Sequence, residues 1–207
     1  MVVTLRMDPE ARRARIVEAC LAVMIRKGIA ATTVRDVAAE MGSSAGLVHH
    51  YFGSMDDLLA AAFDQAAGQD LAETRAAVAR HADPVQRLRA FFGAYTRADQ
   101  DWAFQLWLDA WADAARRPAL QETSQRLNVA WQRLVAEIVE EGVAAGEFTC
   151  PDPGATAWRV LSLMDGLALQ TVAHRVEVDR RAVLTWSTAY AEQELGLPAG
   201  SLRDDRA

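Results

Sequence analysis

Short polar side chains suited to binding a phosphate backbone gather between residues 32 and 52. Ser43 and Ser44 come at the start of a predicted helix, where free N–H groups approach anions and small side chains permit close contact. His49 and His50 follow on the outward, polar side of the same helix. The chemistry that this set fits is hydrogen bonding to the phosphates and bases of duplex DNA.

Two short helices joined by a tight turn would hold these side chains. Apolar residues from 34 to 41 repeat at the spacing of one helix face, and Thr33 before them has the oxygen that caps a helix start. Gly42 supplies the turn because it reaches positive φ easily. Val48 and Tyr51 are apolar positions of the second helix that can pack against the first. This arrangement predicts a helix-turn-helix whose second helix enters the major groove. The alternative is an ordinary helical hairpin with polar residues on its solvent-exposed face.

Residues 12–63 resemble the N-terminal DNA-binding domain of the tetracycline-repressor (TetR) family. The family pattern is an apolar helix, a turn from Gly to Thr-Thr, a helix-turn-helix, Tyr-Phe and a further helix. This chain has these parts in order at 16–27, 28–33, 34–48, 51–52 and from 54 onward. The resemblance implies DNA contacts from the residues at the family's contact positions, which are Thr33, Ser43, Ser44, Gly46, His49, His50 and Tyr51. The outward side of the second helix adds Ala45 and Leu47.

Three positions depart from the family pattern at the DNA-binding surface. The family commonly has a basic residue at Ala45, Tyr at His49 and Lys at Met55, where the Lys binds a phosphate. Their replacement removes phosphate contacts, so binding would depend more on the arginines between Arg6 and Arg15. A helical ligand-binding protein with weakened DNA binding is therefore one alternative function.

Composition and charge fit a globular protein that meets DNA at one end. The 207 residues are 51% hydrophobic and carry a net charge of −6, which excludes a disordered chain. Residues 1–60 are neutral, and the acidic excess lies in residues 61–207, which DNA would repel. That asymmetry argues against a second alternative, a non-specific architectural DNA-binding protein. Cys20 and Cys150 are expected to be core thiols in a reducing cytoplasm.

Motifs for catalysis, secretion or membrane insertion are not found. The sequence has no Gly-rich phosphate loop, Gly-x-Ser-x-Gly, Cys-x-x-Cys or Glu-x-x-His pair, so neither an enzyme nor a bound cofactor or metal is expected. It has no apolar signal core and no apolar run of membrane-spanning length. These features predict a cytoplasmic, non-enzymatic protein without membrane contact.

Helical patterns continue beyond this region, without strand-like alternation or internal repeats. Capping residues, glycines and prolines predict six further helices, at about 55–82, 85–97, 101–116, 118–145, 155–176 and 179–194. The expected fold is all-α with about nine helices, the helix from Met55 being the long connector. The expected domains are a DNA-binding domain at 1–53, a ligand-binding and dimerisation domain at 54–195 and a flexible tail at 196–207.

Tryptophan is concentrated in two consecutive predicted helices of the second domain. Phe104, Trp107 and Trp111 fall on one helix face, and Trp102 and Trp131 are the other aromatic residues of interest. Such a face is either core packing or the wall of a ligand site. With a carboxylate nearby it would suit a cation such as a quaternary amine, which a desolvated aromatic cage stabilises by about 2 kcal/mol.

Residues 85–195 resemble the C-terminal domain of the choline-responsive, betaine-operon repressor subgroup of the same family. The resemblance is carried by Trp107-Leu108 with Trp111, then Pro118, Leu120 and Arg126, then Met164-Asp165-Gly166-Leu167. It implies a small-molecule effector, with choline-like cations as one class. Asp165 is then a candidate ligand carboxylate, and the alternative is a buried, paired acid at a dimer interface.

A homodimer is expected through the last two predicted helices. Ser162, Gly166 and Ala173 lie on one stripe and are small enough for another helix to approach closely. Trp186 and Tyr190, one turn apart, are assigned to the interface or the core. As in the resembled family, two helices from each subunit would form a four-helix bundle.

Together these expectations describe a ligand-responsive transcriptional regulator. In its simplest form it is a repressor that binds a pseudopalindromic operator in double-stranded DNA as a homodimer. A small-molecule effector, either cationic or aromatic and lipophilic, would bind the second domain and favour a conformer that leaves the operator.

Overall fold

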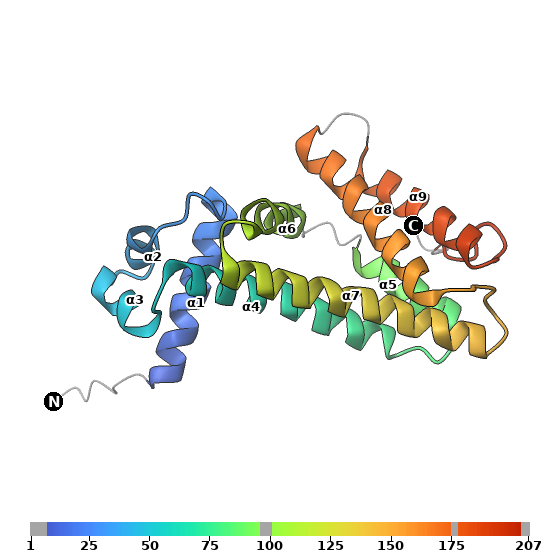
Figure 1. Ribbon diagram of the computed structural model, residues 1–207, viewed down its shortest axis with the longest axis horizontal. Helices are drawn as coiled ribbons and strands as arrows, with labels where there is room; N and C mark the ends of the chain where they lie inside the picture. The colour runs from blue at the N-terminus through green and yellow to red at the C-terminus, as the bar shows by residue number, and fades with distance from the viewer. Residues whose placement is uncertain (1–7, 96–100, 175–177, 204–207) are drawn as a thin grey trace. The chain divides into compact units, whose positions relative to one another are not determined.

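The computed structural model describes residues 8–95, 101–174 and 178–203, and these contain nine α-helices and no strand (Figure 1). The all-α fold predicted from the sequence is therefore confirmed. The helices are α1 (Pro9–Lys27), α2 (Val34–Glu40), α3 (Ala45–Tyr51), α4 (Met55–Val78), α5 (Pro84–Tyr95), α6 (Asp101–Ala114), α7 (Pro118–Ala144), α8 (Pro153–Ala173) and α9 (Arg180–Glu194). None of the helices in these ranges has the length and hydropathy needed to cross a bilayer.

The chain forms two compact units. The first unit contains the residues up to Gly68 together with Gln105–Arg126, and the second contains Gln69–Phe104 and the residues from Leu127 onward. Helices α4, α6 and α7 therefore begin in one unit and end in the other. This division does not coincide with the boundary expected between residues 53 and 54. The expected boundary separates a DNA-binding part from a ligand-binding part, and it stays a prediction.

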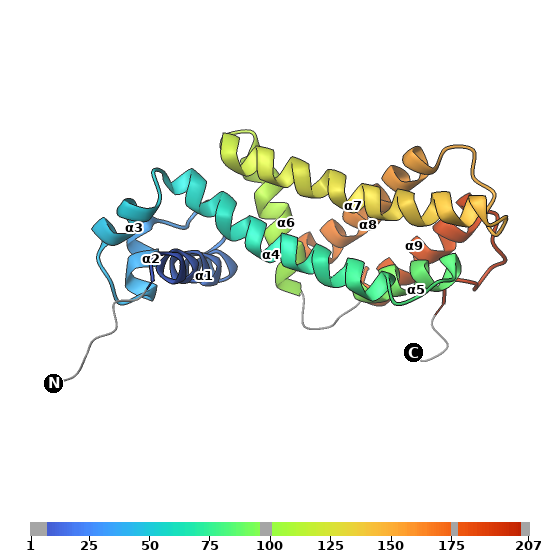
Figure 2. The same cartoon turned by 90° about the horizontal axis from the view of Figure 1, so that it is seen from below.

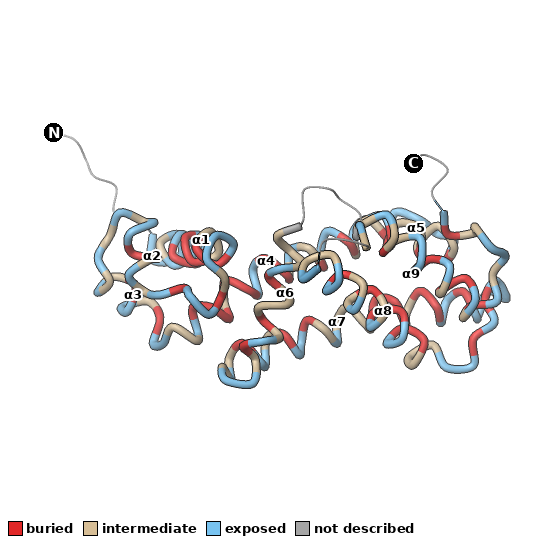
Figure 3. The backbone as a smooth tube through the Cα atoms, turned by 90° about the horizontal axis from the view of Figure 1, so that it is seen from above, coloured by how far each residue is buried: buried red, intermediate tan, exposed pale blue. Residues whose placement is uncertain are grey.

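In the first unit α2 packs against α1, and α3 packs against α2 (Figures 1 and 2). One face of α1 is fully buried, with Ile16, Cys20 and Val23 at 0% exposure. Two ion pairs join its outer face to α2, Arg26–Glu40 at 2.8 Å and Lys27–Asp36 at 2.6 Å. The hydrogen bonds from Lys27 and Thr33 lower the pKa of Asp36 to about 2. Buried and exposed residues alternate along each helix, as amphipathic packing requires (Figure 3).

The helix-turn-helix has the local chemistry that its sequence predicts. Thr33 caps α2 with a reciprocal capping box, in which its hydroxyl accepts from Asp36 N while the Asp36 carboxylate accepts from Thr33 N. Gly42 has a φ of 62°, in the left-handed region that favours glycine. The Ser43 N–H donates to the Ala38 carbonyl at 2.8 Å and closes the turn. These contacts set the direction in which α3 leaves α2.

The second unit has its own apolar core, formed by the end of α4 with α5, α7, α8 and α9. Its fully buried members include Leu88, Phe92, Ile138 and Met164. Helices α8 and α9 pack against each other in this unit. Both cysteines are free and buried, as expected, and burial raises the pKa of Cys20 in the first unit to about 12.

The chain from Gly196 to Arg203 folds back onto the second unit, which differs from the frayed tail expected there. Leu202 is only 2% exposed, so it contributes to the core. The buried Glu192 carboxylate accepts from Gly200 N at 2.8 Å and Leu202 N at 2.7 Å, and Arg89 Nε donates to the Ser201 carbonyl at 2.7 Å. One apolar anchor and one buried acceptor hold a segment whose composition is that of a loop.

Candidate DNA-binding and effector sites

Helix α3 presents the predicted DNA-contacting residues on its outward side. Val48, 1% exposed, anchors the helix to the rest of the first unit. Ser44 is its N-cap, and its Oγ accepts from Leu47 N at 3.3 Å, which leaves the hydroxyl hydrogen available to donate. The predicted contact residues that are exposed on or beside α3 are Ser44, Gly46, His49 and His50, and those that are half-buried are Ser43, Ala45, Leu47 and Tyr51.

The three predicted serine and threonine contacts differ in what their hydroxyl oxygens already bind. Thr33 Oγ1 donates to Asp36 Oδ2 at 2.7 Å, so its hydrogen is used within the capping box. The Ser43 hydroxyl is buried and has no hydrogen-bond partner among the described residues. The Ser44 Oγ accepts the capping hydrogen bond from Leu47 N, but its hydroxyl hydrogen can still be donated. Ser44 therefore has the hydroxyl best placed to bind a phosphate.

Aromatic contacts surround the end of α3. The His50 and Tyr51 rings meet edge to face, with centroids 5.2 Å apart. Phe52 is 5% exposed. The Arg13 guanidinium lies over its ring, with the guanidinium carbon 4.7 Å from the ring centroid. Arg13 is thus held beside the helix-turn-helix, whereas Arg6 lies outside the described residues. The residue at the head of α4 is the half-buried Met55, which has no group to bind a phosphate.

The predicted aromatic set does not form a single cluster within either compact unit. In the first unit Trp107 meets Phe63 edge to face at 4.9 Å, and Trp111 lies 5.4 Å from Trp107. In the second unit Trp131 lies 6.2 Å from Phe91, and Phe104 has the Arg180 guanidinium 4.7 Å from its ring centroid. Trp102 is half-buried in the same unit. The sequence analysis did not identify Phe63 and Phe91 as partners of these rings. Helical periodicity shows which residues share one face of a helix, but not which residues of other helices pack on that face.

The structure exposes the small residues expected at the dimer interface. Ser162, Gly166 and Ala173 are exposed on α8, and a Cβ built on Gly166 meets nothing within 4 Å. Trp186 on α9 is 50% exposed, and Tyr190 is half-buried. Two further large residues are exposed on the α8 stripe, Trp158 at 40% and Leu169 at 42%. They were missed, although their spacing from Ser162 and Gly166 follows the same helical period.

Two family models match this chain. Residues 16–62 match the model of the bacterial regulatory proteins of the tetR family, and residues 84–196 match that of the C-terminal domain of BetI-type transcriptional repressors. The chain belongs to the TetR family. This family comprises transcriptional regulators and not enzymes, and its members bind DNA operators and small-molecule effectors, typically as dimers.

This TetR-family chain is similar in sequence to BetI proteins. The HTH-type transcriptional regulator BetI of Paraburkholderia xenovorans (strain LB400) is 32% identical over 191 residues, covering 88% of this chain and 93% of that protein. BetI of Burkholderia cenocepacia (strain J2315) is 33% identical over 187 residues, covering 88% and 93%. The resemblance drawn from the sequence to the betaine-operon repressor subgroup is confirmed at the level of the family.

Solved structures have the same fold. A transcriptional regulator from Pseudomonas aeruginosa PAO1 is 27% identical with a TM-score of 0.79, covering 98% of this chain and 97% of that one. A regulator from Saccharomonospora viridis in complex with choline has a TM-score of 0.81 at 23% identity, covering 91% and 98%. At that identity the second likeness shows the shared TetR-family fold.

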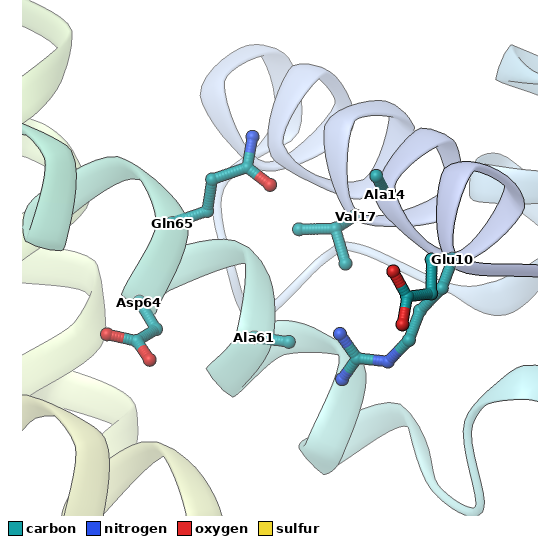
Figure 4. Close-up of a pocket in the computed structure, with 7 residues that line it drawn as sticks. Glu10, Ala14, Val17, Ala61, Asp64 and Gln65 are labelled. Atoms are coloured by element: carbon teal, nitrogen blue, oxygen red, sulfur yellow. The ribbon is translucent and has the colours of Figure 1, made fainter.

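A surface groove in the first unit is lined by none of the predicted effector residues. It has a volume of about 600 Å³ between α1 and α4 (Figure 4). Its lining residues are Glu10, Arg13, Ala14, Val17, Ala61, Asp64 and Gln65. Among them Asp64 is already paired with Arg126 of α7 at 2.7 Å, and the lining mixes both signs of charge. The groove therefore has no strong preference for a cation or an anion.

Burial raises the pKa of Asp165 from its usual 3.8 to about 7. The folded chain then holds the proton more tightly than the unfolded chain, so the free energy of unfolding should fall as pH rises between about 4 and about 7. Asp165→Asn removes that cost. We expect it to raise the free energy of unfolding by roughly 1–2 kcal/mol at about pH 8, and much less at about pH 4, in urea titrations at fixed protein concentration. An equal gain at both pH values would contradict the raised pKa.

Proposed function

We propose that this TetR-family chain is a repressor that binds a pseudopalindromic operator as a homodimer and leaves it when a small-molecule effector binds. The observation that carries the proposal is the outward side of α3, where Ser44, Gly46, His49 and His50 are exposed around a helix anchored by the buried Val48. A helix that has short, polar side chains on its exposed face and a buried opposite face is suited to entering a major groove.

The contacts divide into phosphate binding and base reading. Ser44 and Tyr51, with the chain around Ser43 and Thr33, would meet the phosphates, while Ala45, Leu47, His49 and His50 would face base edges. Since Ala45 and Met55 provide no positive charge, we expect the affinity to fall less steeply with salt than in a family member with basic residues there. In the dimer the two recognition helices would lie roughly 34–36 Å apart, in successive major grooves.

Selection of duplexes by the purified protein from a random double-stranded library tests this part. Enrichment of a palindromic site, with binding to that site far tighter than to a scrambled duplex, is the expected result. Equal binding to both duplexes would support an architectural DNA-binding protein instead. Absence of binding to any duplex would support a ligand-binding protein whose DNA-binding domain is weakened.

The homodimer is proposed to form through α8 and α9. Trp158, Leu169 and Trp186 are large apolar side chains left between 40% and 50% exposed, and the small Ser162, Gly166 and Ala173 lie among them on α8. Tyr190 adds a half-buried aromatic ring to α9. Exposed aromatic side chains around a glycine stripe suit close helix packing with a second copy.

For the effector we propose a small organic cation of the choline class, bound in the second unit. Three observations support this chemistry. Phe104 already has the Arg180 guanidinium over its ring, Trp131 and Trp102 add aromatic surface, and Asp165 provides a carboxylate. The solved neighbour from Saccharomonospora viridis was obtained with choline. Trp107 and Trp111 would then contribute chiefly to packing against Phe63 in the first unit.

Titration with choline, betaine aldehyde and lipophilic cations, read by Trp fluorescence and by release of the selected operator, tests the effector. A saturable change in both signals that Asp165→Asn weakens is expected. Since the carboxylate is a direct ligand in this proposal, an unchanged response in Asp165→Asn would favour the dimer-interface alternative for that residue. Silence with every cation would exclude the cation site.

A further inference from the structure

Asp109 of α6 binds the turn that follows α1, in the same compact unit. Its Oδ2 accepts from Ile29 N at 3.3 Å, and Gln105 Nε2 donates to its Oδ1 at 2.8 Å. Ile29 has 0% exposure, so its N–H is shielded from water and depends on this acceptor. The bond joins residues 80 positions apart in the sequence.

The turn is shaped around this carboxylate. Gly28 has a φ of +82°, and a Cβ built on it would lie 3.1 Å from Asp109 Oδ2. The Gly28 N–H donates to the Met24 carbonyl at 2.8 Å, and Thr32 Oγ1 donates to the Gly28 carbonyl at 2.7 Å. The Gly28 N–H, the Gly28 carbonyl and the Ile29 N–H each have a defined partner, and Asp109 provides the one that is distant in the sequence.

The turn decides where α2 and α3 lie with respect to α1. It ends at Thr33, the N-cap of α2, only four residues after Ile29. The segment that carries Asp109 is itself fixed to the first unit, because Asp56 Oδ2 of α4 accepts from Ala119 N at the start of α7 at 3.0 Å. Trp107, two residues before Asp109, packs on Phe63 of α4. Asp109 is thus held on both sides and can act as a fixed point for the turn.

We infer that Asp109 is a positioning residue for operator binding: by accepting the Ile29 N–H it holds the helix-turn-helix in the arrangement that presents α3. The inference rests on the proposed function, since it needs an operator. The hydrogen-bond partners of Asp109 in the described residues are Ile29 and Gln105, so its effect is exerted through the turn. Because its charge is negative, simple electrostatics would make its removal strengthen DNA binding, which is the opposite of the expected result.

The test compares three variants on the palindromic duplex selected by the wild-type chain. Asp109→Ala removes the acceptor. Asp109→Asn keeps an oxygen for Ile29 N–H, and its new NH₂ can donate to the Gln105 amide oxygen once that amide rotates. Glu122→Ala, an exposed acid of α7 in the same unit, is the control for the loss of one negative charge. All are measured well below their melting temperatures, with hydrogen exchange of the Ile29 amide as a second readout.

Asp109→Ala should weaken operator binding about tenfold or more and speed exchange of the Ile29 amide, since a buried donor loses a charged acceptor. Asp109→Asn and Glu122→Ala should bind like the wild type or slightly tighter. Operator binding by Asp109→Ala equal to that of Glu122→Ala, or failure of Asp109→Asn to restore it, would overturn the inference. A wild-type chain that selects no duplex would refute the proposed function itself, a different outcome.

Discussion

Gly46→Ala should make the folded protein more stable and at the same time weaken operator binding by about tenfold or more. Gly46 lies inside α3, where glycine costs roughly 0.5–1 kcal/mol relative to alanine. A Cβ there meets only Ser44 Oγ, at 3.8 Å, an ordinary contact distance. The fold therefore has no steric need for glycine, and a close approach of DNA to the exposed backbone is the remaining place where a methyl group would clash.

The two opposite signs make this a sharp experiment. A purely structural role for Gly46 would lower stability and binding together, whereas the proposed role raises the first and lowers the second. Gly93→Ala in α5 is the matched control, because a Cβ on Gly93 meets nothing within 4 Å, so it too has no steric clash, and Gly93 lies in the other compact unit. It should raise the melting temperature similarly and leave operator affinity unchanged. Unaltered affinity in Gly46→Ala would remove Gly46 from the DNA-contacting surface.

Local chemistry made the helix-turn-helix readable from the sequence. Thr33 and Ser54 precede their helices with a carboxylate three residues later, and in both cases the hydroxyl accepts the N–H that the spacing predicts. Gly42 is placed where the turn needs positive φ. Caps and turns depend on neighbours within four residues, so the sequence contains all the information that they require.

Long-range contacts were beyond the sequence for the same physical reason. The Asp109–Ile29 bond spans 80 positions and the Asp56–Ala119 bond spans 63, and no local pattern identifies such partners. The sequence also could not show that Trp107 and Trp131 belong to different compact units. Helical periodicity identifies the apolar face of a helix but not the element that packs against it. Residues 198–203 are small and polar in composition, yet Leu202 and the Glu192 carboxylate fix them.

Leu169→Glu should convert the proposed homodimer to monomers and abolish tight operator binding. In one chain Leu169 is 42% exposed, so the fold itself should tolerate a carboxylate at this place. In a twofold dimer through α8 and α9 the substitution appears twice in the same interface, where it buries two like charges and removes the apolar contact. We expect the dissociation constant of the dimer to rise by about a hundredfold or more, measured by sedimentation velocity.

Val129→Glu provides the control, because Val129 of α7 is also 42% exposed and the chemical change has the same sign and nearly the same size. It should remain dimeric and bind the operator normally. If both variants become monomeric, the α8–α9 face is not the interface; if neither does, the exposed Trp186 and Trp158 must be covered by something other than a second copy. Since each recognition helix reads one half-site, a monomer retains only half of the contacts, so the loss of dimer and of operator affinity should appear at the same protein concentration.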